Sequence, residues 1–224
     1  MNLLAMDTGQ AACSVALWRA EGIAAHRYRA MPKGHAEALV PMIEEVQREA
    51  DFSFDELDAL AVTIGPGTFT GLRVGMATAR GIAVAAGKPL IGVTTLEAIA
   101  WPARDEATKA GAAIAAAFDA RRNEIYLQAF EAEGAALTEP GLVDLDSCAG
   151  SLPERPFLCV GTGASLVAER LAAAGRTVTV SEVPPLPDAR SVAAIAVRRG
   201  VTSDTPPVPL YLRAPDAKLP QKPL

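Results

Sequence analysis

The sequence predicts an α/β protein made of two similar domains. Short apolar runs bounded by turn residues alternate with longer stretches of helical periodicity, which indicates strands mixed with helices. Each half of the 224-residue chain opens with a group of predicted strands and closes with strand–helix pairs, and this duplication is the main organising signal. Half of the residues are hydrophobic and 21% are charged, so the chain is globular and can bury a large core.

The first half is predicted to begin with an antiparallel meander. Its strands cover residues 3–6, 12–19 and 23–29, joined by turns at Asp7-Thr8-Gly9-Gln10 and Glu21-Gly22. A helix over 34–50 follows, and Pro41 inside it predicts a later start or a kink.

A strand over 59–64 then leads through a glycine-rich turn into a helix that reaches about residue 86. Gly87 and Pro89 are its stop signals. A strand over 89–93 and a helix capped by Thr94, ending near residue 103, complete the first half.

The second half repeats this order after a polar stretch, residues 104–111, where we place the domain boundary. A hairpin over 112–118 and 124–130 comes first, and the remaining predicted strands cover 142–145, 157–160 and 178–180. Helices are predicted up to about residue 174 and over 191–199. The expected domains are therefore 1–104 and 105–212, with a flexible tail over 213–224.

Charge and cysteine content exclude several classes of function. A net charge of -5 without a Lys/Arg cluster disfavours a protein that grips nucleic acid by itself. The cysteines lack CxxC spacing and lie in apolar surroundings, which favours buried thiols in a reducing compartment. No basic leader and no run of about 20 apolar residues is present, so we expect a cytoplasmic protein without a membrane role.

Metal and triad chemistry lack the necessary residues. The histidines are His26 and His35, and a helical HxxxH pair would need a second histidine where the chain has Leu39. Neither histidine has a glycine-framed nucleophile to serve. We therefore expect no metal site.

Three turns have the composition of nucleotide-binding loops, although Asp-Thr-Gly is also an ordinary turn sequence. They contain Asp7, Thr8 and Gly9; Asp119 and Arg121; and Gly161 and Gly163. Their placement resembles the actin/Hsp70/sugar-kinase superfold, in which two similar domains each open with a strand meander. Arg121 stands where a phosphotransferase of that fold has a glycine, and its bulk blocks close approach of the backbone to a phosphate. We therefore expect vestigial nucleotide loops.

The glycine-rich turn Gly65 to Gly75 fits neither common nucleotide motif. It lacks the Lys-Ser/Thr of a Walker A loop, and its glycines are out of register with GxGxxG. Glycine and alanine recur every fourth residue from 67 to 83, which predicts a helix face with almost no side chains. A helix that is apolar nearly all round is hard for one small domain to cover, so we predict that this face is a protein interface.

The whole length of the chain resembles the bacterial TsaB (YeaZ) family of tRNA threonylcarbamoyladenosine biosynthesis proteins. The run from Gly65 to Gly75 (GPGTFTGLRVG) carries the resemblance most specifically. Supporting it are Met6-Asp7-Thr8, His35 to Leu39 with Pro41, Asp119-Ala120-Arg121 with Glu124-Ile125-Tyr126, and Pro209 to Arg213.

The resemblance implies a non-catalytic scaffold or activator that pairs, through two helices of its first domain, with a TsaD-like transferase subunit. With a TsaE-like ATPase, the complex would form threonylcarbamoyladenosine beside the anticodon of tRNAs reading codons that begin with A. TsaD-like proteins have paired metal histidines, and this chain has His35 and Leu39 in their place. The predicted interface residues are His35, Leu39, Gly71, Leu72, Gly75, Met76 and Ala79.

Three further expectations accompany this interpretation. The isolated chain should need no cofactor, whereas ATP or ADP could bind within the complex. In isolation the same helices should form a homodimer, and tRNA should be contacted through the complex. The alternative functions are an independent ATP-using phosphotransferase or ATPase of the sugar-kinase class, and a metalloprotease, which would require bound metal.

Overall fold

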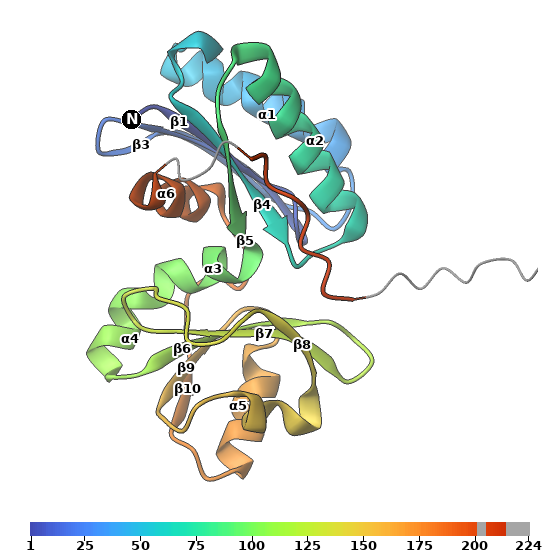
Figure 1. Ribbon diagram of the computed structural model, residues 1–224, viewed down its shortest axis with the longest axis vertical. Helices are drawn as coiled ribbons and strands as arrows, with labels where there is room; N and C mark the ends of the chain where they lie inside the picture. Colours follow the sequence, from blue (N-terminus) through green and yellow to red (C-terminus); the bar gives the residue numbers. More distant parts are fainter. Residues whose placement is uncertain (201–204, 214–224) are drawn as a thin grey trace, which may run out of the picture.

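The computed structural model describes residues 1–200 and 205–213, which form two domains stacked along the long axis of the molecule (Figure 1). Each domain contains a five-stranded sheet flanked by helices. The strands of the first sheet are β1 Leu3–Asp7, β2 Ala12–Arg19, β3 Gly22–Ala30, β4 Ala59–Gly65 and β5 Leu90–Thr94. Those of the second sheet are β6 Ala113–Asp119, β7 Glu124–Phe130, β8 Gly141–Asp144, β9 Phe157–Val160 and β10 Val178–Val180.

Both sheets have one topology. The first has the order β3-β2-β1-β4-β5, and the second, read from its other edge, has the equivalent order β8-β7-β6-β9-β10. In each sheet the first three strands pair antiparallel, and the last two continue in parallel beside the first strand. The duplication predicted from the sequence is therefore present strand by strand.

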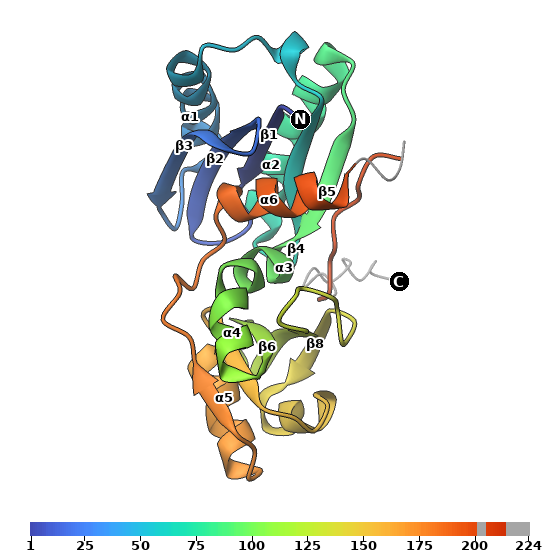
Figure 2. The same ribbon diagram turned by 90° about the vertical axis from the view of Figure 1, so that its left-hand side faces the viewer.

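The helices cover both faces of each sheet. They are α1 His35–Ala50, α2 Phe69–Ala86, α3 Thr95–Ala100, α4 Arg104–Ala110, α5 Ala164–Ala173 and α6 Ala189–Arg199, with short 3-10 turns η1 Phe54–Glu56, η2 Trp101–Ala103 and η3 Leu145–Ser151. Helices α1 and α2 lie side by side on one face of the first sheet and α6 lies on the other (Figures 1 and 2). The α3–η2–α4 segment joins the domains, and its apolar residues pack on one face of the second sheet while α5 packs on the opposite face.

Local sequence signals explain where several helices begin and end. The Thr94 hydroxyl accepts from Glu97 N at 3.1 Å and the Glu97 carboxylate accepts from Thr94 N at 2.8 Å, which makes a capping box at the start of α3. Gly87 ends α2 in the left-handed conformation at φ 64°, as its sequence position predicts. Pro41 lies on an exposed side of α1 and does not end that helix.

Two observations bear on the predicted domain boundary. Residues 104–110 of the polar stretch form α4, with acidic residues in its first turn and Lys109 in its last, as the helix dipole favours. Helix α6, which falls in the predicted domain 105–212, packs against β1 and β2 of the first sheet. The boundary at 104/105 thus separates the strands of the two sheets, whereas α6 comes after it in the chain and packs on the first sheet.

The segment after α6 also returns to the first domain. Leu210 N donates to Ile64 O at 2.8 Å, and the Tyr211 ring lies 5.6 Å from that of Phe69. Residues 214–224, nearly all of the predicted tail, lie outside the described residues. No helix within 1–200 or 205–213 is both long and apolar enough to cross a bilayer.

Candidate functional site

The turn between β1 and β2 contains a buried carboxylate. Asp7 Oδ1 accepts from Thr63 Oγ1 at 2.6 Å and from Gly9 N at 3.1 Å, whereas Oδ2 has no partner. Burial raises the pKa of Asp7 to about 6, and the bond from Thr63 only partly opposes that rise. The Gly9 amide, which a phosphate loop would present to its ligand, is therefore bonded to the chain's own Asp7.

The start of α2 covers the same turn. Thr68 N donates to Gly9 O at 2.8 Å, and Thr8 Oγ1 donates to Gly71 O at 2.7 Å. A Cβ added at Gly71 would lie 2.1 Å from Thr8 O, and one at Gly75 would lie 2.4 Å from Thr8 Oγ1. These glycines lack side chains because the β1–β2 turn occupies the space that side chains would need.

This contact corrects the choice of interface residues. All of them are buried within the first domain: His35, Leu39, Gly71, Leu72, Gly75, Met76 and Ala79. The His35 imidazole lies against Gln10 O, with Nε2 at 3.0 Å, and Leu39 belongs to the core between α1, α2 and the sheet. The bare face of α2 therefore points inward, and the turn of the same chain fills it.

The opposite face of α1 and α2 is exposed. Helix α2 presents a second row of small residues outward, Ala77, Gly81 and Ala85, with Val84 beside them at 77% exposure. On α1 the exposed large apolar residue is Val40, at 48% exposure. A Cβ at Gly81 would meet nothing within 4 Å, so nothing within the chain requires glycine there. We call these five residues the outer face of α1 and α2.

The turn between β6 and β7 closes on itself. Arg121 N donates to Asp119 Oδ1 at 2.8 Å, and the Arg121 guanidinium pairs with Asp119 Oδ2 at 3.3 Å. Main-chain bonds from Ala120 N to Glu124 O and from Glu124 N to Arg121 O complete the turn. The Asp119 carboxylate is thus neutralised within its own hairpin, and the arginine holds a left-handed conformation at φ 63° that a glycine would adopt at lower cost.

The Gly161–Gly163 turn packs against β6. A Cβ at Gly161 would lie 2.2 Å from Ala117 O, and one at Gly163 would lie 3.2 Å from Asp119 N. Gly163 N donates to Ala117 O at 3.0 Å. Packing within the domain accounts for both glycines without a bound adenosine.

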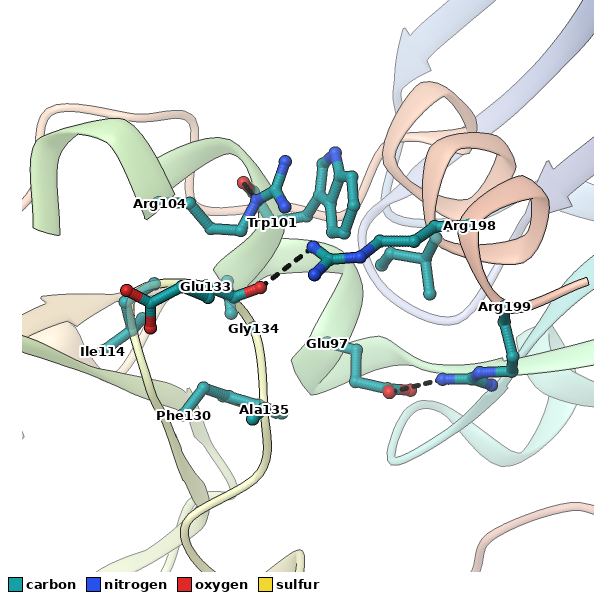
Figure 3. A pocket seen from close by; sticks show the side chains of 12 residues that line it. Glu97, Trp101, Arg104, Ile114, Phe130, Glu133, Gly134, Ala135, Arg198 and Arg199 are labelled. Atoms are coloured by element: carbon teal, nitrogen blue, oxygen red, sulfur yellow. Dashed lines mark hydrogen bonds and ion pairs between the residues drawn. The ribbon is translucent and has the colours of Figure 1, made fainter. Parts of the chain in front are cut away.

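Two further observations bear on chemistry. Within the part of the chain that the structure describes, no group of three or more His, Cys, Asp or Glu side chains could hold a metal ion. A cavity of about 350 Å³ lies between α3, α4, α6 and the loop after β7, away from both hairpins (Figure 3). The sequence did not predict this cavity, because Trp101, Arg104 and Arg198 form no local motif.

Comparison with known proteins identifies the family. The family model described as TsaD, tRNA N6-adenosine threonylcarbamoyltransferase, matches residues 29–201. The tRNA threonylcarbamoyladenosine biosynthesis protein TsaB of Escherichia coli is 40% identical over 128 residues, which are 56% of this chain and 53% of that protein. The chain belongs to this family, and within it to the TsaB (YeaZ) proteins.

Two relatives match over nearly the full length of the chain, and one of them is a YeaZ protein. An uncharacterised protein of Mycobacterium tuberculosis is 33% identical over 221 residues, covering 97% of this chain and 94% of that protein. The structure of YeaZ from Pseudomonas aeruginosa superposes with a TM-score of 0.75 at 29% identity, covering 94% of this chain and 99% of that one. The predicted fold, two similar domains of the actin/Hsp70/sugar-kinase superfold, is confirmed by this match and by the duplicated strand order. The chain spans about half the length of the E. coli relative that it matches.

Proposed function

We propose that this chain is a non-catalytic subunit that pairs with a TsaD-like transferase in forming threonylcarbamoyladenosine on tRNA, together with a TsaE-like ATPase. The observation that carries the proposal is the state of the two hairpins. In each of them the groups that would hold phosphates are bonded within the chain, Gly9 N to Asp7 and Arg121 to Asp119. A subunit in which both turns are bonded within the chain in this way would act through its surface.

The outer face of α1 and α2 is the surface we assign to the TsaD-like partner. Val84 exposes 77% of its area near the end of α2, and Gly81 costs the isolated helix about 1 kcal/mol relative to alanine. A small residue at an exposed helix position is explained when a second helix approaches closely. In the absence of that partner, the same face would pair with a second copy of this chain.

Reconstitution tests this proposal directly. Purified TsaD-like and TsaE-like subunits from the same organism are assayed for threonylcarbamoyladenosine in tRNA, with ATP present and threonylcarbamoyl adenylate supplied as the donor, with and without this chain. We expect modification to require the chain, and the chain to co-purify with the TsaD-like subunit. Modification at an unchanged rate without it would contradict the proposal, as would ATP turnover by the isolated chain that Asp7→Ala abolishes.

The position of the interface is tested by Gly81→Leu. An exposed leucine leaves the domain folded but places a large side chain where the partner helix would lie, so we expect loss of both co-purification and modification. Ala172→Leu is the matched control, since Ala172 is likewise exposed on a helix, α5, in the second domain. If Gly81→Leu binds as tightly as the control, the interface lies elsewhere.

A further inference from the structure

The cavity between the domains has an apolar floor and a charged rim. Ala100 and Ile195 line it from α3 and α6, and Ile114 and Phe130 line it from the second sheet. Its volume of about 350 Å³ falls within the range of sites for small ligands. The cavity lies apart from the outer face of α1 and α2 and from both hairpins, so what it binds is independent of the proposed function.

One of the three arginines at the rim has an acidic partner. Arg199 pairs with Glu97 Oε1 at 2.6 Å and donates to Gly92 O at 2.8 Å. The other carboxylate oxygen of Glu97 accepts the main-chain amide of Thr94 at the start of α3. Glu97 is therefore paired with Arg199 and bonded to the start of α3, and it makes no ion pair with Arg104 or Arg198.

The other two arginines share one indole and have no acidic partner. The guanidinium carbon of Arg104 lies 3.3 Å from the centre of the Trp101 ring, and that of Arg198 lies 5.9 Å from it. Their hydrogen bonds go to main-chain oxygens: Arg104 Nε to Trp101 O at 3.1 Å, and Arg198 to Glu133 O at 3.0 Å (Figure 3). Among the described residues, no carboxylate lies within ion-pair distance of either guanidinium.

The nearby acids make no ion pair with these two arginines. Glu131 pairs with Arg155 at 2.8 Å, and Asp105 is exposed at the start of α4. The Glu133 side chain is also exposed, and its carboxylate lies at the end away from Arg198 (Figure 3). Burial lowers the pKa of Arg104 and the neighbouring charge of Arg198 lowers it further, while the charge of Asp105 opposes the shift without reversing it. Two like charges thus face one partly desolvated cavity, an arrangement that an anion would stabilise.

We propose that this cavity binds a small organic anion, whose carboxylate or phosphate group is held by Arg104 and Arg198. Guanidinium groups bind both kinds of anion through paired N–H donors that lie in one plane, and the contact of Arg104 with the Trp101 ring holds that plane in place. The apolar floor at Ile114 and Phe130 favours a ligand with a planar or apolar body over a bare inorganic ion.

Binding would also connect the two domains. Arg198 belongs to α6, which packs on the first sheet, whereas Phe130 belongs to β7 of the second sheet. A ligand that contacts both is bound by the folded arrangement only, so it should raise the melting temperature as its concentration exceeds the dissociation constant.

The test uses phenyl phosphate, benzoate and inorganic phosphate as probes on the full chain. The chain has two tryptophans, so Trp18→Phe leaves Trp101 as the fluorescent reporter at the site. We expect phenyl phosphate or benzoate to bind with a dissociation constant of about 1 mM or tighter and to change the Trp101 emission. The tighter of the two identifies phosphate or carboxylate as the anionic group, and inorganic phosphate should bind more weakly than phenyl phosphate.

Substitutions assign the binding to the two arginines. Arg198→Gln should weaken binding at least about tenfold, and Arg198→Lys should weaken it less. Arg48→Gln, an exposed substitution on α1 with the same change in net charge, should bind as the parent does. Glu133→Gln should bind equally or more tightly. Thermal melts of each variant establish that it is folded.

Three results would overturn the proposal. The first is no binding of phenyl phosphate or benzoate to the parent chain. The second is equal affinity in Arg198→Gln and Arg48→Gln, which would locate the anion elsewhere. The third is a Trp101 response to single-stranded RNA but to neither small anion, which would make the arginines part of a nucleic-acid surface.

Discussion

Replacing Gly71 by alanine tests whether the bare face of α2 is filled by the chain's own β1–β2 turn. The added methyl group would lie 2.1 Å from the carbonyl oxygen of Thr8 and 2.5 Å from Thr68 Oγ1. Overpacking of a core costs about 1–3 kcal/mol, and a main-chain obstacle places this site at the upper end. Alanine recovers less than about 1 kcal/mol of helix propensity in the first turn, so we expect a net loss of about 2 kcal/mol in the free energy of unfolding.

Gly81→Ala is the matched control on the same helix. No atom lies within 4 Å of its added methyl group, so only the propensity term applies, and the free energy of unfolding should rise by about 1 kcal/mol. Urea unfolding of both variants in a Trp101→Phe background, followed by Trp18 in the first sheet, measures the difference. If the isolated Gly71→Ala chain is as stable as Gly81→Ala, the turn does not fill this face and the face is free to dock a partner.

Two further predictions concern buried polar groups. The pKa of Asp7 is raised to about 6 in the folded chain, so the stability linked to its protonated form is fully present below about pH 4 and is lost as the pH rises through 6. Between pH 4 and pH 8 the free energy of unfolding of Asp7→Asn should therefore rise by about 3 kcal/mol relative to that of the parent, as measured by urea unfolding. A difference between the two that does not change with pH would refute the raised pKa. The thiols of Cys13, Cys148 and Cys159 are buried, and burial also raises the pKa of each. None of them should react with an aromatic disulfide reagent in the native chain, whereas all should react in denaturant. Labelling of any one of them in the native chain would refute this prediction.

The sequence predicted elements well where the signal was local. Strands β7, β9 and β10 match their predicted bounds to the residue, because each is a short apolar run between turn residues. The N-terminal cap of α3 and the end of α2 at Gly87 also follow from single residues. The helix over 104–110 is not predicted, because the charges of this stretch indicate exposure but do not distinguish a surface helix from a loop.

The errors at the candidate site have one physical cause. The periodicity of Gly71, Gly75 and Ala79 correctly predicts a bare helix face, but it does not reveal what covers that face. The partner turned out to be the turn at Thr8, which comes from a distant part of the chain. The anion cavity escaped prediction for the same reason, since Arg104 and Arg198 meet only when α6 returns to the first sheet. Long-range contacts of this kind leave no pattern within a single segment.

The turns of the β1–β2 and β6–β7 hairpins are closed by different contacts. The first is covered by a distant segment, since Thr68 and Gly71 at the start of α2 bond to the turn. The second is closed locally, by Arg121 pairing with Asp119. No single substitution reopens both, because removing the Arg121 side chain leaves the first turn covered. The duplicated architecture thus persists with both turns bonded within the chain, and the surfaces that we propose for binding are the outer face of α1 and α2 and the cavity between the domains.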